Sequence, residues 1–443
     1  MLLIYVQKLN PRIEYITQLI FSEILHIDYE FSTNSREFQQ SDWPKFNYST
    51  EKFKDEFYIK PHRLMFSRAI LQPVLEPVWY EGNKYFCESS KDSDLPFDPL
   101  AASFYVVTRH EEYTEQQKDK LDRYPAQRSI LVKHQLLQKP VVNIWAKLLG
   151  DKLQQRYPSI EITKNKFQFI SSIDIDNAWA YLHKGFWRSG INLFRSLLKN
   201  REEFGERLRV LSGKQNDPYD SYSYLDKIFS GNEDKALFFI LLGDYARYDK
   251  NISHRNKHYQ KLIRDIRQKY EVGIHPSFAS SRAENGHKVE TERLRLQNIV
   301  GNDIRKSRQH FLRLTLPHSY RRLITCGIQE DYTMGYSCLP GFRAGICTPY
   351  YFYDLEQEST TNLRIVPFQI MDGTFTHYLH LSPDKAWQEI QKIMLEVKNI
   401  GGTFVSIWHN ETVTDKGIWK GYREVFETMN KTGFQWANEE AGT

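Results

Sequence analysis

The stretch Phe169–Trp179, FISSIDIDNAW, ends an apolar run with two carboxylates, Asp174 and Asp176. Side chains alternate between the two faces of a β-strand, so both acids are expected on the same face, a short distance apart. Like charges held that close repel each other unless a cation lies between them or one acid stays protonated. A solvated strand end or a helix N-cap would account for a single acid, whereas the pair favours a functional site.

The chain from Lys166 onward alternates strand-like apolar runs with helical segments. The strand-like runs are residues 167–173, 236–243, 271–276, 304–311, 363–371 and 403–410. The predicted helices are residues 258–269, 290–300, 317–327, 383–400 and 419–433. The clearest of them has Ser382 as its expected N-cap and Gly401 at its end. Strands that alternate with helices predict a parallel α/β fold, here a (β/α) barrel that is either broken or seven-stranded.

The first part of the chain has a different pattern. Residues 1–95 are predicted to form a small α/β domain, which starts with a strand and a helix that begins near Pro11. The polar, proline-containing segment KDSDLPFDP, residues 91–99, marks a candidate boundary. Residues 96–165 carry helical stripes and are expected to connect this domain to the barrel domain at residues 166–443. The sequence alone indicates no role for the first domain.

Composition and charge exclude several classes of function. The chain has 60 Lys and Arg against 55 Asp and Glu, a net charge of only +5, so nucleic-acid binding is not expected. It shows no signal peptide and no uncharged run of about 18 residues, so no membrane span is expected. The four cysteines show no C-x-x-C spacing, which is typical of free thiols in a reducing, cytoplasmic compartment. No organic cofactor site is predicted, and the oligomeric state is not indicated.

Polar side chains stand where several of the predicted strands end. They are Asp174 and Asp176, His275, Arg308 and His310, and His409. The carboxyl ends of parallel strands lie at one edge of a barrel, where the active sites of such folds are found. A single histidine is more often a structural residue, but acids, histidines and an arginine at four strand ends favour one shared site.

The residue types of this set suit a catalytic divalent ion, with zinc as the first choice. One acid of the Asp174–Asp176 pair would bind the ion, while the other would act as a base, its charge balanced by the ion and by Arg308. Water activated at the ion would attack an amide or ester carbonyl, and His409 would protonate the leaving amine. These residues therefore predict a metal-dependent hydrolase.

Several segments resemble the motifs of the NodB-type polysaccharide deacetylase family. KALFFILLGD, residues 235–244, looks like the family's ATFFV-x-G strand, and SIDIDN, residues 172–177, stands where the family has T-F-D-D-G. RQHF, residues 308–311, is similar to the R-x-P-[FY] motif. Ile407–His409 maps onto the final L-x-H motif.

The resemblance extends over about residues 166–435, with all motifs in family order. LITCGIQEDYTMGY, residues 323–336, resembles the L-x-x-x-G-F-x-Y-D-S-S segment, with Asp331 at its aspartate. The resemblance implies that Asp174 is the base and Asp176 a metal ligand. Residues 1–165 would then be the N-terminal extension of a little-characterised subgroup.

The second ligand motif of the family, H-[ST]-x-x-H, is only half present. GIHPSFAS keeps His275, but Ala279 stands where the second histidine is usual. His310 could supply the missing ligand, because it points to the same side as the arginine of its motif. His287 is a weaker candidate, and a two-ligand site with more water is a further possibility.

Three functions follow from these patterns. The first is removal of an acyl group, such as acetyl, from an N-acylated sugar or polysaccharide precursor. In the cytoplasm this would be a nucleotide-linked, lipid-linked or soluble oligosaccharide substrate. The second is a metal-dependent glycosyltransferase that uses Asp174-Ile175-Asp176 as a D-x-D motif. The third is a carbohydrate-binding relative that has lost its metal, for which Ala279 is the main indication.

Overall fold

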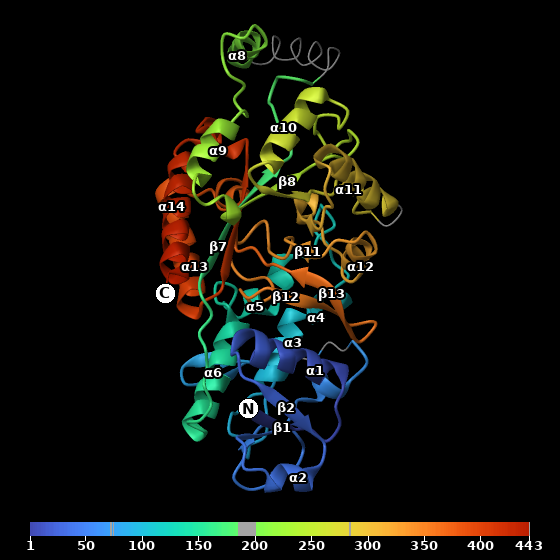
Figure 1. Ribbon diagram of the computed structural model, residues 1–443, viewed down its shortest axis with the longest axis vertical. Helices are drawn as coiled ribbons and strands as arrows, with labels where there is room; N and C mark the ends of the chain where they lie inside the picture. The colour runs from blue at the N-terminus through green and yellow to red at the C-terminus, as the bar shows by residue number, and fades with distance from the viewer. Residues whose placement is uncertain (71–72, 74, 185–200, 283–284, 443) are drawn as a thin grey trace.

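The computed structural model describes residues 1–70, 73, 75–184, 201–282 and 285–442. Figure 1 shows an elongated molecule with a small four-stranded sheet at one end and a nine-stranded sheet in its middle. The nine-stranded sheet carries the predicted site residues.

The four-stranded sheet has the order β2-β1-β3-β4 and is parallel throughout. Its strands are β1 (Leu2–Tyr5), β2 (Tyr29–Ser32), β3 (Lys45–Asn47) and β4 (Phe57–Tyr58). Between β1 and β2, α1 (Pro11–Thr17) begins where Asn10 accepts hydrogen bonds from two backbone N–H groups of the first turn, and it continues as a π-helix (Gln18–Ile24). The strand and the helix predicted at the start of the chain are both present.

Helices and a short hairpin connect the two sheets. The hairpin pairs β5 (Val78–Tyr80) with β6 (Asn83–Tyr85), and the helices of this half are α2 (Ser35–Gln40), α3 (Pro99–Val107), α4 (His110–Thr114), α5 (Ile130–Lys133) and α6 (Val141–Arg156). α3 is buried along its whole length and packs against α1 and α6, while α1 also contacts β13 (Ser359–Ile365) of the large sheet. One hydrophobic core therefore continues from one sheet to the other, and the domain limits near residues 95 and 165 stay predictions.

The nine-stranded sheet has the order β12-β13-β11-β10-β9-β8-β7-β15-β14. Its strands are β7 (Gln168–Ile175), β8 (Ala236–Ile240), β9 (Glu271–Ile274), β10 (Lys306–Ser307), β11 (Glu330–Asp331), β12 (Tyr350–Asp354), β13, β14 (Ile370–Met371) and β15 (Thr403–His409). All neighbours are parallel except β12 and β13, which form an antiparallel pair at one edge. The predicted parallel α/β arrangement is present.

The strand order corresponds to a barrel that is open between β13 and β14. Apart from β12, the strands from β7 to β13 follow chain order on one side of β7, and β15 and β14 continue on its other side. Phe239 on β8 and Val405 on β15 share a buried cluster with Val366 and Phe368, which follow β13. The sheet thus curls around a filled interior. Within the described residues no pairing joins β13 to β14, so closure of the barrel is not shown.

Helices cover the outside of this sheet. They are α9 (Tyr222–Phe229), α10 (Lys257–Arg267), α11 (His287–Val300), α12 (His318–Thr325), α13 (Pro383–Ile400) and α14 (Tyr422–Ala441), while α8 (Arg201–Leu211) lies away from the sheet at the top of the view in Figure 1. In Figure 1, α13 and α14 lie together on one side of the sheet, and α10, α11 and α12 lie on the other. α13 has the predicted limits, with Ser382 at the N-cap and Gly401 in the left-handed conformation at the C-cap.

Three predicted elements differ from the structure. The strand predicted at 363–371 is not continuous: it contains the end of β13, then residues 366–369 outside any strand, and then β14 on the other side of β7. The strand predicted at 304–311 is limited to β10, because the chain then leaves the sheet and the N–H of His310 bonds to the carbonyl of Pro276. The last helix does not end at Gly433. A β-carbon at this position would lie 2.3 Å from the Phe169 ring, so glycine here allows α14 to pack closely on β7 and continue.

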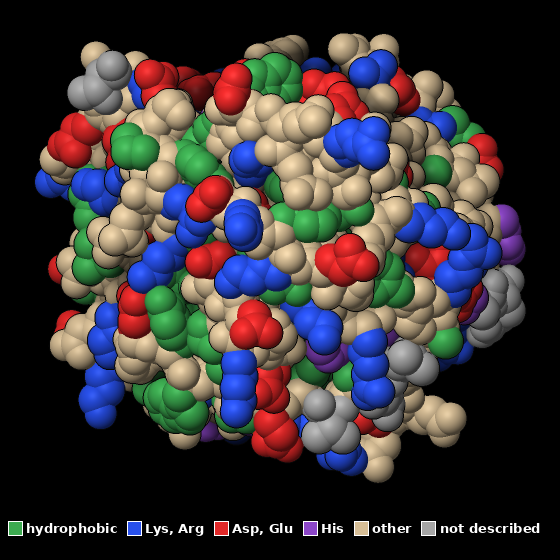
Figure 2. Space-filling model, turned by 90° about the horizontal axis from the view of Figure 1, so that it is seen from below, with side chains coloured by type: hydrophobic (Ala, Val, Ile, Leu, Met, Phe, Trp, Pro, Cys, Tyr) green, Lys and Arg blue, Asp and Glu red, His purple; other side chains and the backbone are tan. Residues whose placement is uncertain are grey.

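The face of the molecule drawn in Figure 2 carries side chains of both charges. Figure 2 looks at the end of the molecule formed by the small sheet, and Lys and Arg lie beside Asp and Glu over this face. Among the described residues, no helix has both the length and the apolar character needed to cross a membrane.

Candidate functional site

The predicted site residues meet at the carboxyl ends of neighbouring strands. In the sheet register His409 on β15 lies beside Asp174 on β7, while His275 and Arg308 follow directly after β9 and the two-residue strand β10. Asp176 lies just past the end of β7. All the predicted site residues except Arg308 line one cavity of 340 Å³. The expectation that these side chains share one cleft agrees with this geometry, whereas their chemical roles stay predictions.

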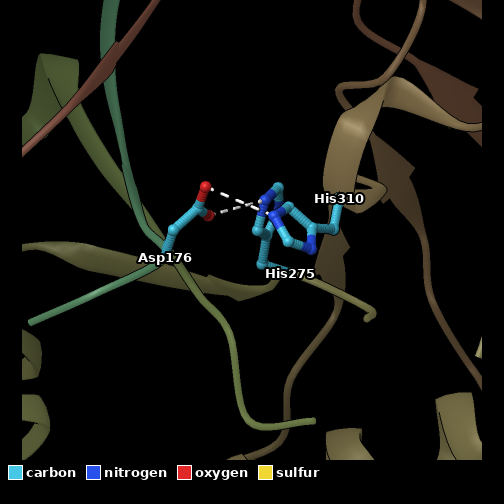
Figure 3. Close-up of side chains that lie close together, drawn as sticks. All are labelled: Asp176, His275 and His310. Atoms are coloured by element: carbon cyan, nitrogen blue, oxygen red, sulfur yellow. Dashed lines mark ion pairs between the residues drawn. The ribbon is translucent and has the colours of Figure 1, made fainter. Parts of the chain in front are cut away.

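Asp176, His275 and His310 converge on one point (Figure 3). The Nε2 atom of His275 lies 3.2 Å from Oδ1 of Asp176, and the Nε2 atom of His310 lies 3.3 Å from Oδ2. One donor atom from each residue lies within 4.8 Å of the other two. Oδ1 of Asp176 is buried and accepts no hydrogen bond. The three side chains thus present two nitrogens and a carboxylate to a single position.

The second ring nitrogen of each histidine is also held. Nδ1 of His275 lies 2.6 Å from the carbonyl oxygen of Arg308, which can only accept, so Nδ1 carries a proton and Nε2 is free to act as a ligand. Nδ1 of His310 lies 2.9 Å from Oδ1 of Asp249. The Asp249 carboxylate also accepts the backbone N–H of Ala279 at 3.1 Å. Both rings therefore have a fixed orientation toward Asp176.

The electrostatics of this group favour a positive charge at its centre. Burial alone would raise the pKa of Asp176, but His310 and His275 bring it well below its usual range. Burial alone would lower the pKa of His310, but Asp176 and Asp249 raise it to about 9. A proton on His310 thus balances the carboxylates, and a divalent ion bound at the same place would displace it.

Asp174 forms a second unit with Arg308. Nη1 of Arg308 lies 2.7 Å from Oδ1 of Asp174, and the guanidinium is fully buried. Its Nε donates to the carbonyl of Tyr332 at 3.1 Å, and the group stacks over the Phe239 ring at 4.3 Å. The other carboxylate oxygen of Asp174 lies 3.8 Å from Nε2 of His275. Asp174 is therefore anchored through one oxygen, while the other faces the ligand group.

His409 forms a third unit with Asp372. Nδ1 of His409 lies 3.0 Å from both oxygens of the fully buried Asp372, which also accepts the hydroxyl of Thr412 at 2.6 Å. Burial alone would lower the pKa of His409, but Asp372 and, more weakly, Asp176 and Asp174 raise it well above its usual value. These carboxylates therefore favour the imidazolium form of His409, whose Nε2 lies 3.9 Å from Oδ2 of Asp176.

Two other residues that the sequence singled out, His287 and Asp331, do not line the cavity, whereas Glu411 does. His287 is exposed at the start of α11 and does not line the cavity, so it is not a further ligand. Asp331 is buried beneath the site, where Thr333 donates to it through its N–H and its hydroxyl, at 3.0 and 2.9 Å. Burial raises the pKa of Asp331 to about 6. Glu411 does line the cavity, and burial together with Asp176 raises its pKa to about 7.

Sequence reasoning missed two acids that orient the site. Asp372 directly follows β14, so the rule that polar residues at parallel strand ends meet in one place would have included it. The strand has only two residues, which hides it in the sequence pattern. Asp249 lies in the connection after β8, and no spacing links it to His310. Only the fold brings this pair together.

The three converging side chains fit a divalent metal ion. Two imidazole nitrogens and one carboxylate form a common ligand set of catalytic zinc, which leaves coordination positions for water and substrate. Around an ion with bonds of about 2.1 Å, tetrahedral ligand atoms lie about 3.4 Å apart. The nitrogen–oxygen distances of 3.2 and 3.3 Å, which end on the two different oxygens of Asp176, are close to this spacing. Both histidines also have their second nitrogen held by an oxygen, as metal-binding histidines usually do.

A family model matches the first part of the chain. Residues 2–158 match a family of unknown function, DUF7033. No curated protein matches the sequence.

Solved structures with a partial likeness include two described as polysaccharide deacetylases and one described as a CE4 family pseudoenzyme. A Mycobacterium smegmatis protein described as a polysaccharide deacetylase is 16% identical, covering 63% of this chain and 92% of its own, with a TM-score of 0.39. A polysaccharide deacetylase from Bacillus cereus is 11% identical, covering 61% and 89%, with a TM-score of 0.31. A mutant of a CE4 family pseudoenzyme with restored enzymatic activity is 10% identical, covering 61% and 65%, with a TM-score of 0.29. Because these TM-scores lie below 0.5, the function proposed next rests on the side chains of the site.

Proposed function

We propose that the chain is a metal-dependent hydrolase that removes an acyl group, in the first place acetyl, from the nitrogen of an N-acylated sugar or polysaccharide precursor. The observation that carries this proposal is the arrangement of three units around one cavity. Asp174 is paired with Arg308, Asp176 faces two histidines, and His409 is paired with Asp372. Hydrolysis of an amide needs a base, an electrophilic centre and an acid, and these units suit the three roles.

Asp176, His275 and His310 would hold the divalent ion, with zinc as the first choice. When bound, the ion would polarise the acyl carbonyl and make nearby water more acidic. His310 would replace the second histidine of the NodB-type motif, since Ala279 has no ligand atom at that position.

Asp174 would take the proton from the attacking water. The Arg308 guanidinium donates to Oδ1 of Asp174 at 2.7 Å, so it offsets the charge of the carboxylate and fixes its orientation toward the water. The arginine is also fixed by its bond to the carbonyl of Tyr332. Arg308 therefore orients and balances the base and does not itself exchange protons.

His409 would give a proton to the leaving nitrogen through Nε2. Asp372 holds the opposite ring nitrogen and keeps the imidazole protonated, which is the form that a general acid needs before the reaction. The amine then leaves as a neutral group and not as an unstable anion.

The surroundings of the cavity support a carbohydrate with more than one ring. A second hollow of 510 Å³ adjoins the first, and both are lined by Glu411 and Trp419. Tyr181 and Tyr219 also line it. Aromatic faces beside polar groups are suited to stacking on sugar rings. The N-acylated sugar would then lie at Asp176, with its neighbour along the chain in the second hollow.

The two alternative functions fit the geometry less well. In a D-x-D glycosyltransferase both acids would face the ion, but Asp174 is bound to the buried Arg308. A binding protein without metal is supported by Ala279, yet His310 offers the nitrogen that this position lacks. The orientation of Asp249 and Asp372 toward histidine rings is also more than binding alone requires.

The proposal is tested with the full chain, zinc or cobalt, and N-acetylglucosamine oligomers of one to six units as probes. Release of acetate that depends on added metal and falls in Asp174→Asn supports it. Hydrolysis of a UDP-sugar without acetate release would favour the glycosyltransferase. No metal binding together with retained oligomer binding would favour the binding protein.

A further inference from the structure

The turn that follows His310 has an unusual backbone. Phe311 and Leu312 have φ values of 58° and 55°, in the left-handed region that residues other than glycine seldom adopt. Two such residues in succession persist only where the surrounding structure holds them in place. The position of His310 therefore depends on contacts that this turn makes with other parts of the chain.

The loop 119–123 supplies such contacts. Nη1 of Arg123 donates to the carbonyl oxygen of Phe311 at 3.1 Å. Asp122 forms an ion pair with Arg313, on the other side of the turn. The loop therefore contacts the turn at two points, at the first of the two left-handed residues and at the residue that follows the second.

The loop is itself well ordered by local hydrogen bonds. Oδ2 of Asp119 lies 2.7 Å from Nε of Arg123, and Oδ1 accepts the backbone N–H groups of Leu121 and Arg123, both at 2.9 Å. Nη1 of Arg123 also donates to the Ser337 hydroxyl at 2.7 Å, and only 13% of its side chain is exposed. Arg123 is thus a fixed support and not a mobile surface cation.

His310 needs independent positioning because it lies on a different segment from its partner ligands. Asp176 follows β7 and His275 follows β9, each at the end of a strand of at least four residues. His310 lies beyond the two-residue strand β10. Asp249 sets the rotation of its ring, and its backbone N–H bonds to the carbonyl of Pro276, while the turn holds the chain on the other side of His310.

We propose that the loop 119–123 is a clasp that positions His310 for metal binding. The loop lies inside the segment 2–158 that matches DUF7033, so this segment supports a ligand group whose three members all follow strands of the large sheet. This inference rests on the metal site of the proposed function. It assigns a role to a part of the chain for which the sequence indicated none.

The test uses metal affinity, which a merely structural contact would not change. Arg123→Ala and Asp122→Ala in the full chain are each expected to weaken zinc binding by about 10-fold or more, as loss of outer-sphere support usually does. The visible spectrum of the cobalt-loaded protein should change with them, because one nitrogen ligand is displaced. Arg123→Lys should recover part of the affinity, since one ammonium keeps the charge but cannot reach both Phe311 and Ser337.

Arg128→Ala is the matched control. Arg128 lies in the same segment and pairs with Glu115 at 3.7 Å, away from the turn. Its loss should leave zinc affinity and the cobalt spectrum unchanged. Asp122 is 55% exposed, so its removal is the milder change if Arg123→Ala does not fold.

The possible outcomes distinguish a failure of the clasp proposal from a failure of the proposed metal site. If Arg123→Ala and Asp122→Ala unfold at lower temperature but bind zinc as tightly as the parent protein, the clasp is overturned. His310→Ala serves as the reference variant. If it loses affinity while the loop variants keep theirs, only the clasp fails. If His310→Ala itself keeps full affinity, the proposed metal site is wrong.

Discussion

His310 faces Asp176 at 3.3 Å through one ring nitrogen and Asp249 at 2.9 Å through the other. Its ring cannot rotate without losing one of these contacts. This arrangement makes His310 part of a convergent ligand group, although it lies outside the H-[ST]-x-x-H spacing of the motif that the chain resembles. Ala279, where that motif has its second histidine, instead donates its N–H to Asp249.

Asp174→Asn should separate catalysis from metal binding. The amide keeps the shape of the side chain but cannot accept the proton of the attacking water. Turnover is expected to fall by about 10²–10⁴-fold, while metal stoichiometry stays the same. Measuring both on one preparation checks this. Should Asp174→Asn release the metal while Asp176→Asn retains it, the roles of the two acids are exchanged.

Asp372→Asn should change the pH profile of kcat. Asp372 is the main group that raises the pKa of His409, so its neutral replacement lowers that pKa. The general acid works only when protonated, and activity is lost as the pH rises through its pKa. The alkaline limb of the profile should therefore move to lower pH. An unchanged limb would show that His409 is not the acid.

Glu112→Gln should reduce stability in a pH-dependent way. Burial alone would raise the pKa of Glu112, but Arg343 and Arg109 bring it to about 2. The unfolded value is about 4.3, so the charged pair stabilises the fold above that pH and this contribution is lost as the pH falls toward 2.

Urea unfolding of Glu112→Gln checks this linkage. At pH 7 we expect a loss of about 3–5 kcal/mol, the usual cost of breaking a buried ion pair. The gap to the parent protein should narrow as the pH falls below 4. A gap that is the same at pH 7 and pH 3 would contradict the assigned pKa.

Trp419→Ala should discriminate between short and long substrates. The side chain lines both hollows, so its loss removes stacking surface between adjacent sugar rings. We expect KM to rise about 10-fold for a tetramer, which corresponds to the loss of roughly 1.4 kcal/mol of binding, with a smaller effect on the monomer. Equal effects on both lengths would place the second ring elsewhere.

Much of the site was predictable because parallel strands align their carboxyl ends. Asp174, Asp176, His275 and His409 each follow an apolar run that is long enough to recognise, so the fold rule brings them together. The predicted strand 304–311 added Arg308 and His310, although only the two residues of β10 form a strand there. The rest could not be predicted, because β11 and β14 have two residues each and leave no periodic pattern.

Contacts between segments that are far apart in the chain also could not be predicted from the sequence. Asp249 reaches His310 from an irregular connection, and Arg123 reaches the same turn from the first part of the chain. Neither pairing follows from local spacing or propensity. The prediction that the last helix ends at Gly433 was wrong for a related reason. Glycine is needed at this position because the Phe169 ring lies against it, and not because the helix ends there.

The most direct test of the account is a zinc titration of the metal-free full chain and three single variants. The parent protein should bind one ion. His275→Ala and His310→Ala should each weaken binding by at least about 100-fold, because a ligand is lost and a buried carboxylate remains. His287→Ala, which changes an exposed histidine outside the cavity, should match the parent. Full-affinity binding by His275→Ala or His310→Ala would contradict the proposed metal centre and the hydrolase that depends on it.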